Sequence, residues 1–281
     1  MPPDAPGTES FGPDDSRHLN PLRDEAEYQA SLHTKARIEE ALRVAGGDIR
    51  AAQKLLNSRT VEPQYEACFA EEPVVLGPMT GSTWRWNPRR LGFVLARYKF
   101  VAQMVKGFER VAEIGCADAF PSCVVRDAVG QLDLYDFDPI WVAEANKLHP
   151  GRARQLDIVG GSWDLSFDRG LARYDALYMC DVIEHVSPGD EVLMMDNVHT
   201  MLKSTGVFIA GCPSLESQVY ASEISRAGHV NCRSGEQLRR DMQRYFQNVF
   251  LFGMNDEMLH AGFAPMCHYL FALCAGPKRF C

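Results

Sequence analysis

The chain has 281 residues, of which 46% are hydrophobic and 23% are charged, and its formal net charge is -8. This length is enough for one large domain with a sizeable core, or for one domain with an appendage. The negative charge argues against broad, non-specific binding to nucleic acid, whose phosphate backbone favours a basic surface, although it does not exclude a local basic patch.

The cysteines and the apolar segments indicate the cellular compartment. The nine cysteines are scattered singly, which favours reduced, buried thiols over a disulfide framework. Residues 1–21 contain no basic region followed by an apolar core, so no signal peptide is expected. No uncharged apolar run is long enough to span a bilayer. The sequence therefore predicts a soluble, cytoplasmic protein that does not contact a membrane.

The N-terminal part of the chain divides into a tail and a helical segment. Residues 1–22 are rich in Pro, Gly, Asp and Ser, which is typical of a disordered tail. From about Asp24 to Leu56 the apolar residues recur at helical spacing, with a break at Gly46-Gly47. This pair of helices resembles the first helices of ubiquitin-associated and Fis-type modules. We expect residues 23–85 to form a helical appendage or lid that packs or forms a homodimer; a separate binding module is the alternative.

Residues 86–281 alternate between helix-like and strand-like segments. An amphipathic helix begins at Asn87 and Pro88. Apolar runs then predict strands at 111–114, 132–137, 175–180 and 206–211. Helix-like segments between these runs indicate βαβ units, and two final runs at 248–256 and 268–276 predict closing strands with an antiparallel edge. The expected fold is α/β, a Rossmann-like, doubly wound and mostly parallel seven-stranded sheet.

The loop after the first predicted strand is short of glycine. The stretch EIGCADA, residues 113–119, contains Gly115 and then alanines at 117 and 119. In an open α/β sheet, ligands bind beyond the C-terminal ends of the strands, where the turn must let them approach the backbone. The missing glycines argue against the pyrophosphate of a dinucleotide. Small residues at alternate positions still admit an adenosine ligand without phosphates.

Four further stretches follow this loop in order: LDLYDFDP at 132–139, ARQLDIVGG at 153–161, YDALYMCDVIEHV at 174–186 and MLKSTGVFIAGCPS at 201–214. Together with EIGCADA they resemble the class I S-adenosylmethionine-dependent methyltransferases, particularly the ubiquinone-type and the sugar and natural-product O-methyltransferases. The family's first motif is an acidic residue followed by glycines at alternate positions. This chain keeps the acidic residue, Glu113, and the first glycine, Gly115, and has alanines at the other two glycine positions. The resemblance covers roughly residues 90 to 275.

The resemblance implies S-adenosyl-L-methionine as cofactor and S-adenosyl-L-homocysteine as product. In the family pattern Asp136 accepts hydrogen bonds from the ribose diol, with Asp138 as the second choice, and Asp157 meets the adenine amino group. Arg97 suits the methionine carboxylate, and Glu113 orients the loop or meets the ligand's ammonium through water. The expected cofactor contacts are Glu113, Gly115, Cys116, Ala117, Asp136, Phe137, Asp157, Ile158, Cys180, Asp181, Arg97 and Tyr98.

Two histidines are candidates for the catalytic base, because removing the proton of an acceptor hydroxyl assists its methylation. His185 follows the fourth predicted strand with Asp181 and Glu184, and the resemblance makes these three residues face the acceptor. His229 lies in an insertion after the fifth strand, which lines or covers the acceptor pocket in the family. The alternative for each histidine is a structural role in fixing its loop.

Asp181, Glu184, His185 and His229 also resemble the metal ligands of small-RNA 2′-O-methyltransferases, which bind magnesium through an acid-x-x-Glu-His string and a later histidine. Because magnesium prefers oxygen ligands, we expect no metal here. The expected function is methyl transfer to a small-molecule acceptor in biosynthesis, favouring a hydroxyl of a sugar or a natural-product intermediate, with no nucleic-acid partner. Small-molecule N-methylation, an RNA or protein acceptor, and a non-catalytic S-adenosylmethionine-binding protein are the alternatives.

Overall fold

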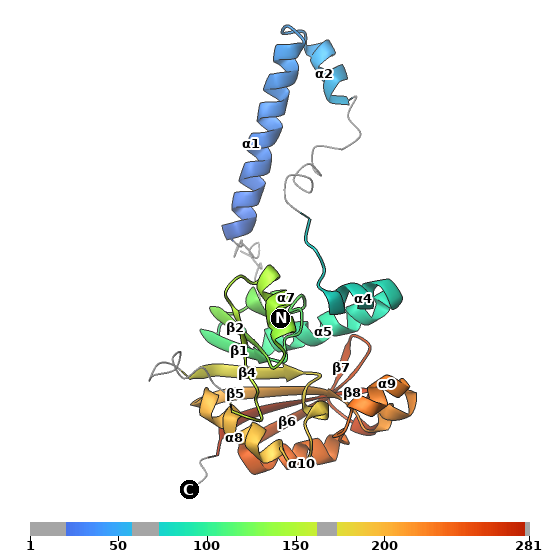
Figure 1. Cartoon of the computed structure of the whole chain (residues 1–281). Coiled ribbons are helices and arrows are strands. Elements are labelled where there is room, and N and C mark those ends of the chain that lie inside the picture. The colour runs from blue at the N-terminus through green and yellow to red at the C-terminus, as the bar shows by residue number, and fades with distance from the viewer. Residues whose placement is uncertain (1–20, 58–72, 162–172, 279–281) are drawn as a thin grey trace, which may run out of the picture. The chain divides into compact units, whose positions relative to one another are not determined.

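The computed structural model describes residues 21–57, 73–161 and 173–278. The chain divides into two compact units, Met1–Val75 and Leu76–Cys281 (Figure 1). Most of the predicted disordered tail lies outside the described residues. Its last two residues correct the predicted boundary, because the first helix already begins at Pro21.

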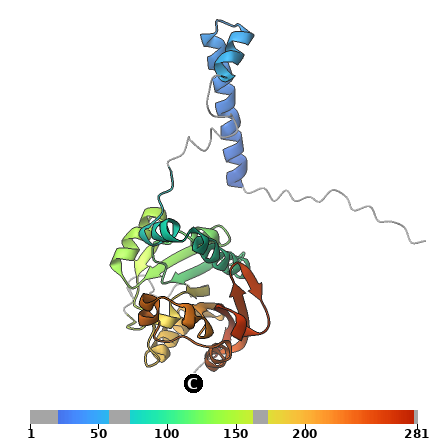
Figure 2. The ribbon, with the colours of Figure 1, turned by 90° about the vertical axis from the view of Figure 1, so that its right-hand side faces the viewer.

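The first unit contains a helical hairpin, as predicted (Figure 2). Helix α1 (Pro21–Val44) and helix α2 (Ile49–Asn57) are joined at Gly46 and Gly47, whose φ angles of 61° and 86° suit glycine. Among the side chains described in this unit, Ala41 and Ala52 are the buried apolar ones. The homodimer that we expect through these helices stays a prediction.

The second unit is built on a sheet that has eight strands within the described residues. The strands are β1 (Arg110–Ile114), β2 (Gln131–Asp136), β3 (Ala153–Gln155), β4 (Tyr174–Cys180), β5 (Leu202–Pro213), β6 (Phe246–Asn255), β7 (Met258–His260) and β8 (Tyr269–Pro277). Their order is β3-β2-β1-β4-β5-β8-β6-β7. Neighbours from β3 to β5 are parallel, whereas β8 runs antiparallel to β5 and β6, which confirms the predicted antiparallel edge.

The prediction of seven strands is one short, because β7 forms a hairpin with β6. All three residues of β7 are exposed, so the sequence contains no buried apolar run that would predict this strand. The turn between the two strands contains Asp256 at a positive φ of 50°.

Helices cover both faces of the sheet, so the doubly wound prediction is confirmed (Figure 1). Helices α5 (Pro88–Met104), α6 (Cys123–Arg126) and α7 (Pro139–Leu148) bury apolar side chains against one face. Helices α8 (Glu191–Met201) and α10 (Gly235–Tyr245) pack on the other. Along β1, Val111 and Ala112 point into opposite cores, as the two-residue period of a strand requires.

The division between the units lies ten residues before the boundary predicted at 85/86. Helix α4 (Pro78–Trp86) belongs with the sheet, because its first turn is anchored to the loop after β1. The backbone N–H and hydroxyl of Thr80 donate to the buried carboxylate of Asp118 at 2.7 and 2.9 Å. Gly77 approaches so closely that a Cβ there would lie 2.3 Å from the Asp118 Cβ.

No helix in the three described ranges combines the length and the apolar character needed to cross a membrane.

Candidate functional site

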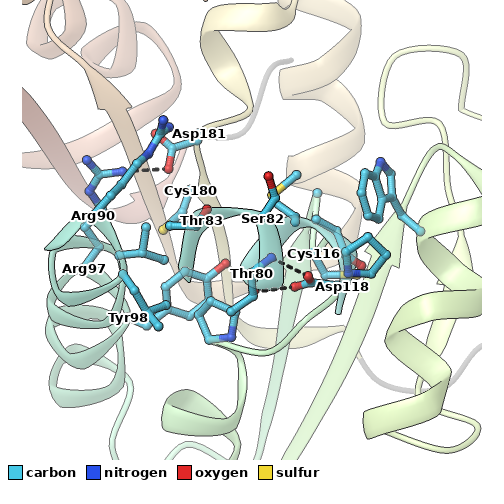
Figure 3. Close-up of a pocket in the computed structure, with 18 of the residues that line it drawn as sticks. Thr80, Ser82, Thr83, Arg90, Arg97, Tyr98, Cys116, Asp118, Cys180 and Asp181 are labelled. Carbon is cyan, nitrogen blue, oxygen red and sulfur yellow. Dashed lines mark hydrogen bonds and ion pairs between the residues drawn. The ribbon is translucent and has the colours of Figure 1, made fainter. Parts of the chain in front are cut away.

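A cavity of about 640 Å³ opens at the C-terminal ends of β1 and β4. Its walls come from the loop after β1, from α4 and α5, and from the segment after β4 (Figure 3). Strand β1 lies between β2 and β4, and the chain order reverses there from β3-β2-β1 to β4-β5. Open α/β sheets bind their ligands at such a switch point. The cavity is therefore the candidate functional site.

The loop after β1 keeps a glycine-type shape without its later glycines. Gly115, Ala117 and Ala119 have φ angles of 79°, 48° and 54°, all in the left-handed region. A Cβ at Gly115 would lie 2.3 Å from the Val182 Cγ2, so this position requires glycine. The two alanines adopt a conformation that costs an L-residue roughly 1–2 kcal/mol. The loop therefore adopts a glycine-like backbone conformation at two alanines.

Hydrogen bonds from β2 hold this loop in place. The Tyr135 carbonyl accepts from the N–H groups of Gly115 and Cys116 at 2.7 and 3.0 Å. The Asp136 carboxylate accepts from the N–H groups of Ala117 and Asp138 at 2.9 and 3.1 Å. Burial raises the pKa of Asp136 above its ordinary value. Asp136 is 4% exposed and does not line the cavity, so the structure shows it as an anchor of the loop, and its ribose contact stays a prediction.

Glu113 lies inside the protein, behind the loop. Its carboxylate accepts hydrogen bonds from the hydroxyls of Tyr98, Ser122 and Tyr178 at 2.5, 2.5 and 2.6 Å. Burial raises the pKa of Glu113 to about 7. These contacts fit the predicted role of orienting the loop. They correct the alternative of a water-mediated contact with the ligand's ammonium, because the side chain is fully buried and is not part of the cavity wall.

Three other predicted cofactor contacts are not brought to the cavity wall. Ile158 is 7% exposed and packs in the core beside α8. The Asp157 carboxylate accepts from the N–H groups of Val159 and Gly160, both at 2.9 Å, so it shapes its own turn. Phe137 is 69% exposed. Their roles at the adenine end of a ligand stay predictions.

An arginine and an acid from separate elements meet in the cavity wall. Arg97 on α5 pairs with Asp181 after β4, with 2.9 Å between the Arg97 Nη1 and the Asp181 Oδ2 (Figure 3). The guanidinium also lies 3.7 Å from the centre of the Tyr269 ring, which favours a cation–π contact. The Arg97 Nε is buried without a hydrogen-bond partner. The predicted contact of Arg97 with the methionine carboxylate stays a prediction.

The sequence reasoning missed part of the cavity wall. Five residues on α4 line it: Pro78, Met79, Thr80, Ser82 and Thr83. Trp84 and Trp86, at the end of the same helix, are 58% and 79% exposed and lie outside the wall. The signal that could have identified the helix start was Pro78, because proline favours the first position of a helix.

Two thiols also line the cavity, from Cys116 in the loop and from Cys180 at the end of β4. Both side chains are buried. Burial and the negative charge of nearby carboxylates raise the pKa of both thiols well above the ordinary value.

The two predicted catalytic histidines come together on the cavity wall. His185 ends a short 3-10 turn, Ile183–His185, and His229 follows α9 (Glu223–Gly228). Their ring centres are 5.1 Å apart. The His185 Nδ1 lies 2.9 Å from the Gly228 carbonyl oxygen. Because a carbonyl only accepts, the His185 Nδ1 must donate, so in the neutral ring the lone pair is on Nε2.

Glu184 completes this group, although it is only 1% exposed. Neither of its carboxylate oxygens has a hydrogen-bond partner. Burial, followed by the charge of Asp181, raises the pKa of Glu184 well above its ordinary value. One ligand atom from each of Glu184, His185 and His229 lies within 4.8 Å of the others. These three groups could hold a divalent cation, and the expectation of no metal stays a prediction.

The chain was compared with known proteins. No protein-family model matches it, and no curated protein sequence matches it either. Solved structures do match. The DhpI–SAH complex has a TM-score of 0.50 at 15% identity, covering 71% of this chain and 90% of DhpI. The plantazolicin methyltransferase BpumL in complex with SAH has a TM-score of 0.50 at 13% identity, covering 70% of this chain and 89% of BpumL.

A SAM-dependent methyltransferase from Archaeoglobus fulgidus is similar to the same extent, with a TM-score of 0.50 at 15% identity, covering 68% of this chain and 94% of that protein. The predicted fold is therefore confirmed: the chain has the Rossmann-like fold of the S-adenosylmethionine-dependent methyltransferases.

Proposed function

We propose that this chain transfers a methyl group from S-adenosylmethionine to a small-molecule acceptor, favouring a hydroxyl of a sugar or a natural-product intermediate. One observation carries the proposal. The cavity at the switch point of the sheet has the loop after β1 in one wall and the histidine pair in another. Two similar structures, DhpI and BpumL, are complexes with SAH, which supports the choice of cofactor.

The residues of the cavity fit this cofactor. The volume of about 640 Å³ lies within the range of roughly 300–1,000 Å³ that is usual for small-molecule sites. Gly115, Cys116 and Ala117 line the cavity, and Arg97 adds a guanidinium to its wall, a group that suits a carboxylate. When bound, S-adenosylmethionine would supply an electrophilic methyl group on a sulfonium. In this proposal Asp136 accepts from the ribose hydroxyls.

The chain's own contribution to the reaction is to position the acceptor and to remove its proton. His185 offers a lone pair on Nε2, since its Nδ1 is bound to the Gly228 carbonyl. His229 lies beside it. Either imidazole can therefore accept the proton of an acceptor hydroxyl that enters the cavity.

Calorimetry with S-adenosylmethionine and S-adenosylhomocysteine tests this function. We expect Asp136→Ala to lose binding, because both the loop anchor and the ribose acceptor are removed. Asp127→Ala is the matched control, since Asp127 is exposed and pairs with its neighbour Arg126 outside the cavity wall. We expect His185→Ala to bind normally and to lose about 10²–10⁴-fold in turnover on a panel of hydroxylated acceptors. Failure of the wild-type protein to bind either compound would overturn the proposal.

A second version of the chemistry uses a divalent cation on Glu184, His185 and His229. The observation in its favour is the buried Glu184 carboxylate, whose two oxygens have no partner. Two imidazoles with one carboxylate suit manganese, cobalt or zinc better than magnesium. Asp181, the fourth residue of the resemblance, is paired with Arg97 instead. When bound, such a cation would act as a Lewis acid on the acceptor hydroxyl.

Titration with Co²⁺ after chelator treatment distinguishes the two versions. If a metal is used, we expect Co²⁺ to bind with a stoichiometry of about one, Glu184→Gln to weaken it, and the chelated protein to lose turnover until metal is restored. If the chelated protein binds no Co²⁺ and its turnover is unchanged, the metal version is wrong and the version with a histidine base remains.

A further inference from the structure

The segment that carries His229 is connected by hydrogen bonds to the end of β5. Ser214, directly after β5, is fully buried. Its carbonyl oxygen accepts from the Gln218 Nε2 at 3.1 Å. Gln218 belongs to the 3-10 turn Glu216–Tyr220, and its Oε1 lies 2.9 Å from the His229 Nδ1. One glutamine side chain thus bridges a buried carbonyl and a histidine of the candidate site.

This bridge determines which nitrogen of His229 carries the proton. The Ser214 carbonyl cannot donate, so the amide nitrogen of Gln218 must face it. The amide oxygen of Gln218 then faces His229, and because that oxygen only accepts, the His229 Nδ1 must donate. The lone pair of His229 is therefore on Nε2, as it is in His185.

We propose that Gln218 is the positioning residue of His229, and that it fixes the tautomer in which the Nε2 lone pair is offered to the group formed with Glu184 and His185. This inference rests on the proposed function. It holds for both versions of the chemistry, because a proton acceptor and a metal ligand both need that lone pair. Carbonyl and amide partners on the remote nitrogen are a common means of orienting functional histidines.

A second set of contacts fixes the distance between the two histidine segments. The Asn231 N–H donates to the Glu184 carbonyl at 3.0 Å, and its side-chain amide donates to the Val186 carbonyl at 3.0 Å. The Gly228 carbonyl, one residue before His229, accepts from His185. The segment after β5 therefore orients both imidazoles. The backbone carbonyl of Gly228 orients His185, and the side chain of Gln218 orients His229.

The test uses full-length protein labelled with ¹⁵N-histidine. Long-range ¹H–¹⁵N spectra report the tautomer of each imidazole, and His229→Gln identifies the signals of His229 by their loss. We expect His229 in the wild type to be protonated on Nδ1 when its ring is neutral. Gln218→Met has a similar length but no acceptor, and we expect it to mix the two tautomers and to lower kcat about 10–100-fold, with little change in KM. Gln218→Glu keeps the acceptor that faces His229 but loses the donor to the Ser214 carbonyl, and we expect it to retain the wild-type tautomer.

Gln243→Met is the matched control, because Gln243 is exposed on α10 and lies outside the cavity wall. We expect it to leave both the spectra and kcat unchanged. A wild-type His229 protonated on Nε2, or a Gln218→Met variant with one Nδ1–H tautomer and full turnover, would overturn the inference. The proposed function fails if the wild-type protein binds no S-adenosylhomocysteine. In that case the tautomer of His229 in the wild type and in Gln218→Met still tests the role of Gln218.

Discussion

Ala117 stores backbone strain in the wall of the cavity. It has a φ of 48° and is only half-buried, so its methyl group contributes little packing. Glycine adopts this conformation without a steric penalty, although it loses more chain entropy on folding. We expect Ala117→Gly to raise the free energy of unfolding by about 0.5–1 kcal/mol, measured by denaturant titration.

Ala143→Gly is the matched control for that change. Ala143 is exposed in the middle of α7, where glycine disfavours the helix. We expect the control to be destabilised by about 1 kcal/mol. Loss of stability in both variants would contradict the assignment of strain to Ala117.

Glu113 makes the stability of the fold depend on pH. Its pKa is raised from 4.5 to about 7 in the folded state, chiefly by burial. Between these values the folded protein binds more protons than the unfolded chain, so the free energy of unfolding must fall as the pH rises. The shift corresponds to roughly 3 kcal/mol across this window. We expect Glu113→Gln to remove that decrease when denaturant titrations are repeated from pH 4.5 to pH 8.

Glu109→Gln provides the comparison for Glu113, since Glu109 is an exposed glutamate just before β1. A pH dependence that is the same in both variants would show that another group is responsible.

At the scale of elements, the position of α4 depends on one carboxylate. Asp118 accepts from both the N–H and the hydroxyl of Thr80, in the first turn of α4, where a negative charge is also favourable. We expect Asp118→Asn to loosen α4, because an amide keeps only one acceptor oxygen. In the proposed function this lowers the affinity for S-adenosylhomocysteine about tenfold, which calorimetry can measure.

The control for the α4 anchor is Asp127→Asn, because Asp127 is exposed and contacts only its neighbour Arg126 among the described side chains. We expect its affinity to equal that of the wild type. An unchanged affinity in Asp118→Asn would show that α4 does not need this anchor to form the binding wall.

The elements that could be predicted from the sequence share a simple signal. Strands β1 and β4 are buried on both faces and are mostly apolar in sequence, and α5 and α7 begin at prolines. The short elements β7 and α9 have no buried residues, so their formation depends on neighbours rather than on their own pattern.

At the scale of the whole molecule, the fold was easier to predict than the site. The order of motifs was enough to give the sheet and the general place of the cavity. The walls of that cavity depend on contacts between residues far apart in the sequence, such as Thr80 with Asp118 and Arg97 with Asp181, which are separated by 38 and 84 positions. Asp157 shapes a turn and Ile158 packs in a core, so the motif order alone does not place their side chains at the cavity.

The two buried thiols of the cavity bear on whether the protein could be methylated by its own cofactor. In the proposed function, Cys116 and Cys180 lie in a chamber that receives an alkylating agent. The thiolate, and not the thiol, is the nucleophile, and burial keeps both groups protonated at physiological pH. The same desolvation that packs this end of the sheet therefore protects the protein from methylating its own sulfur atoms between turnovers.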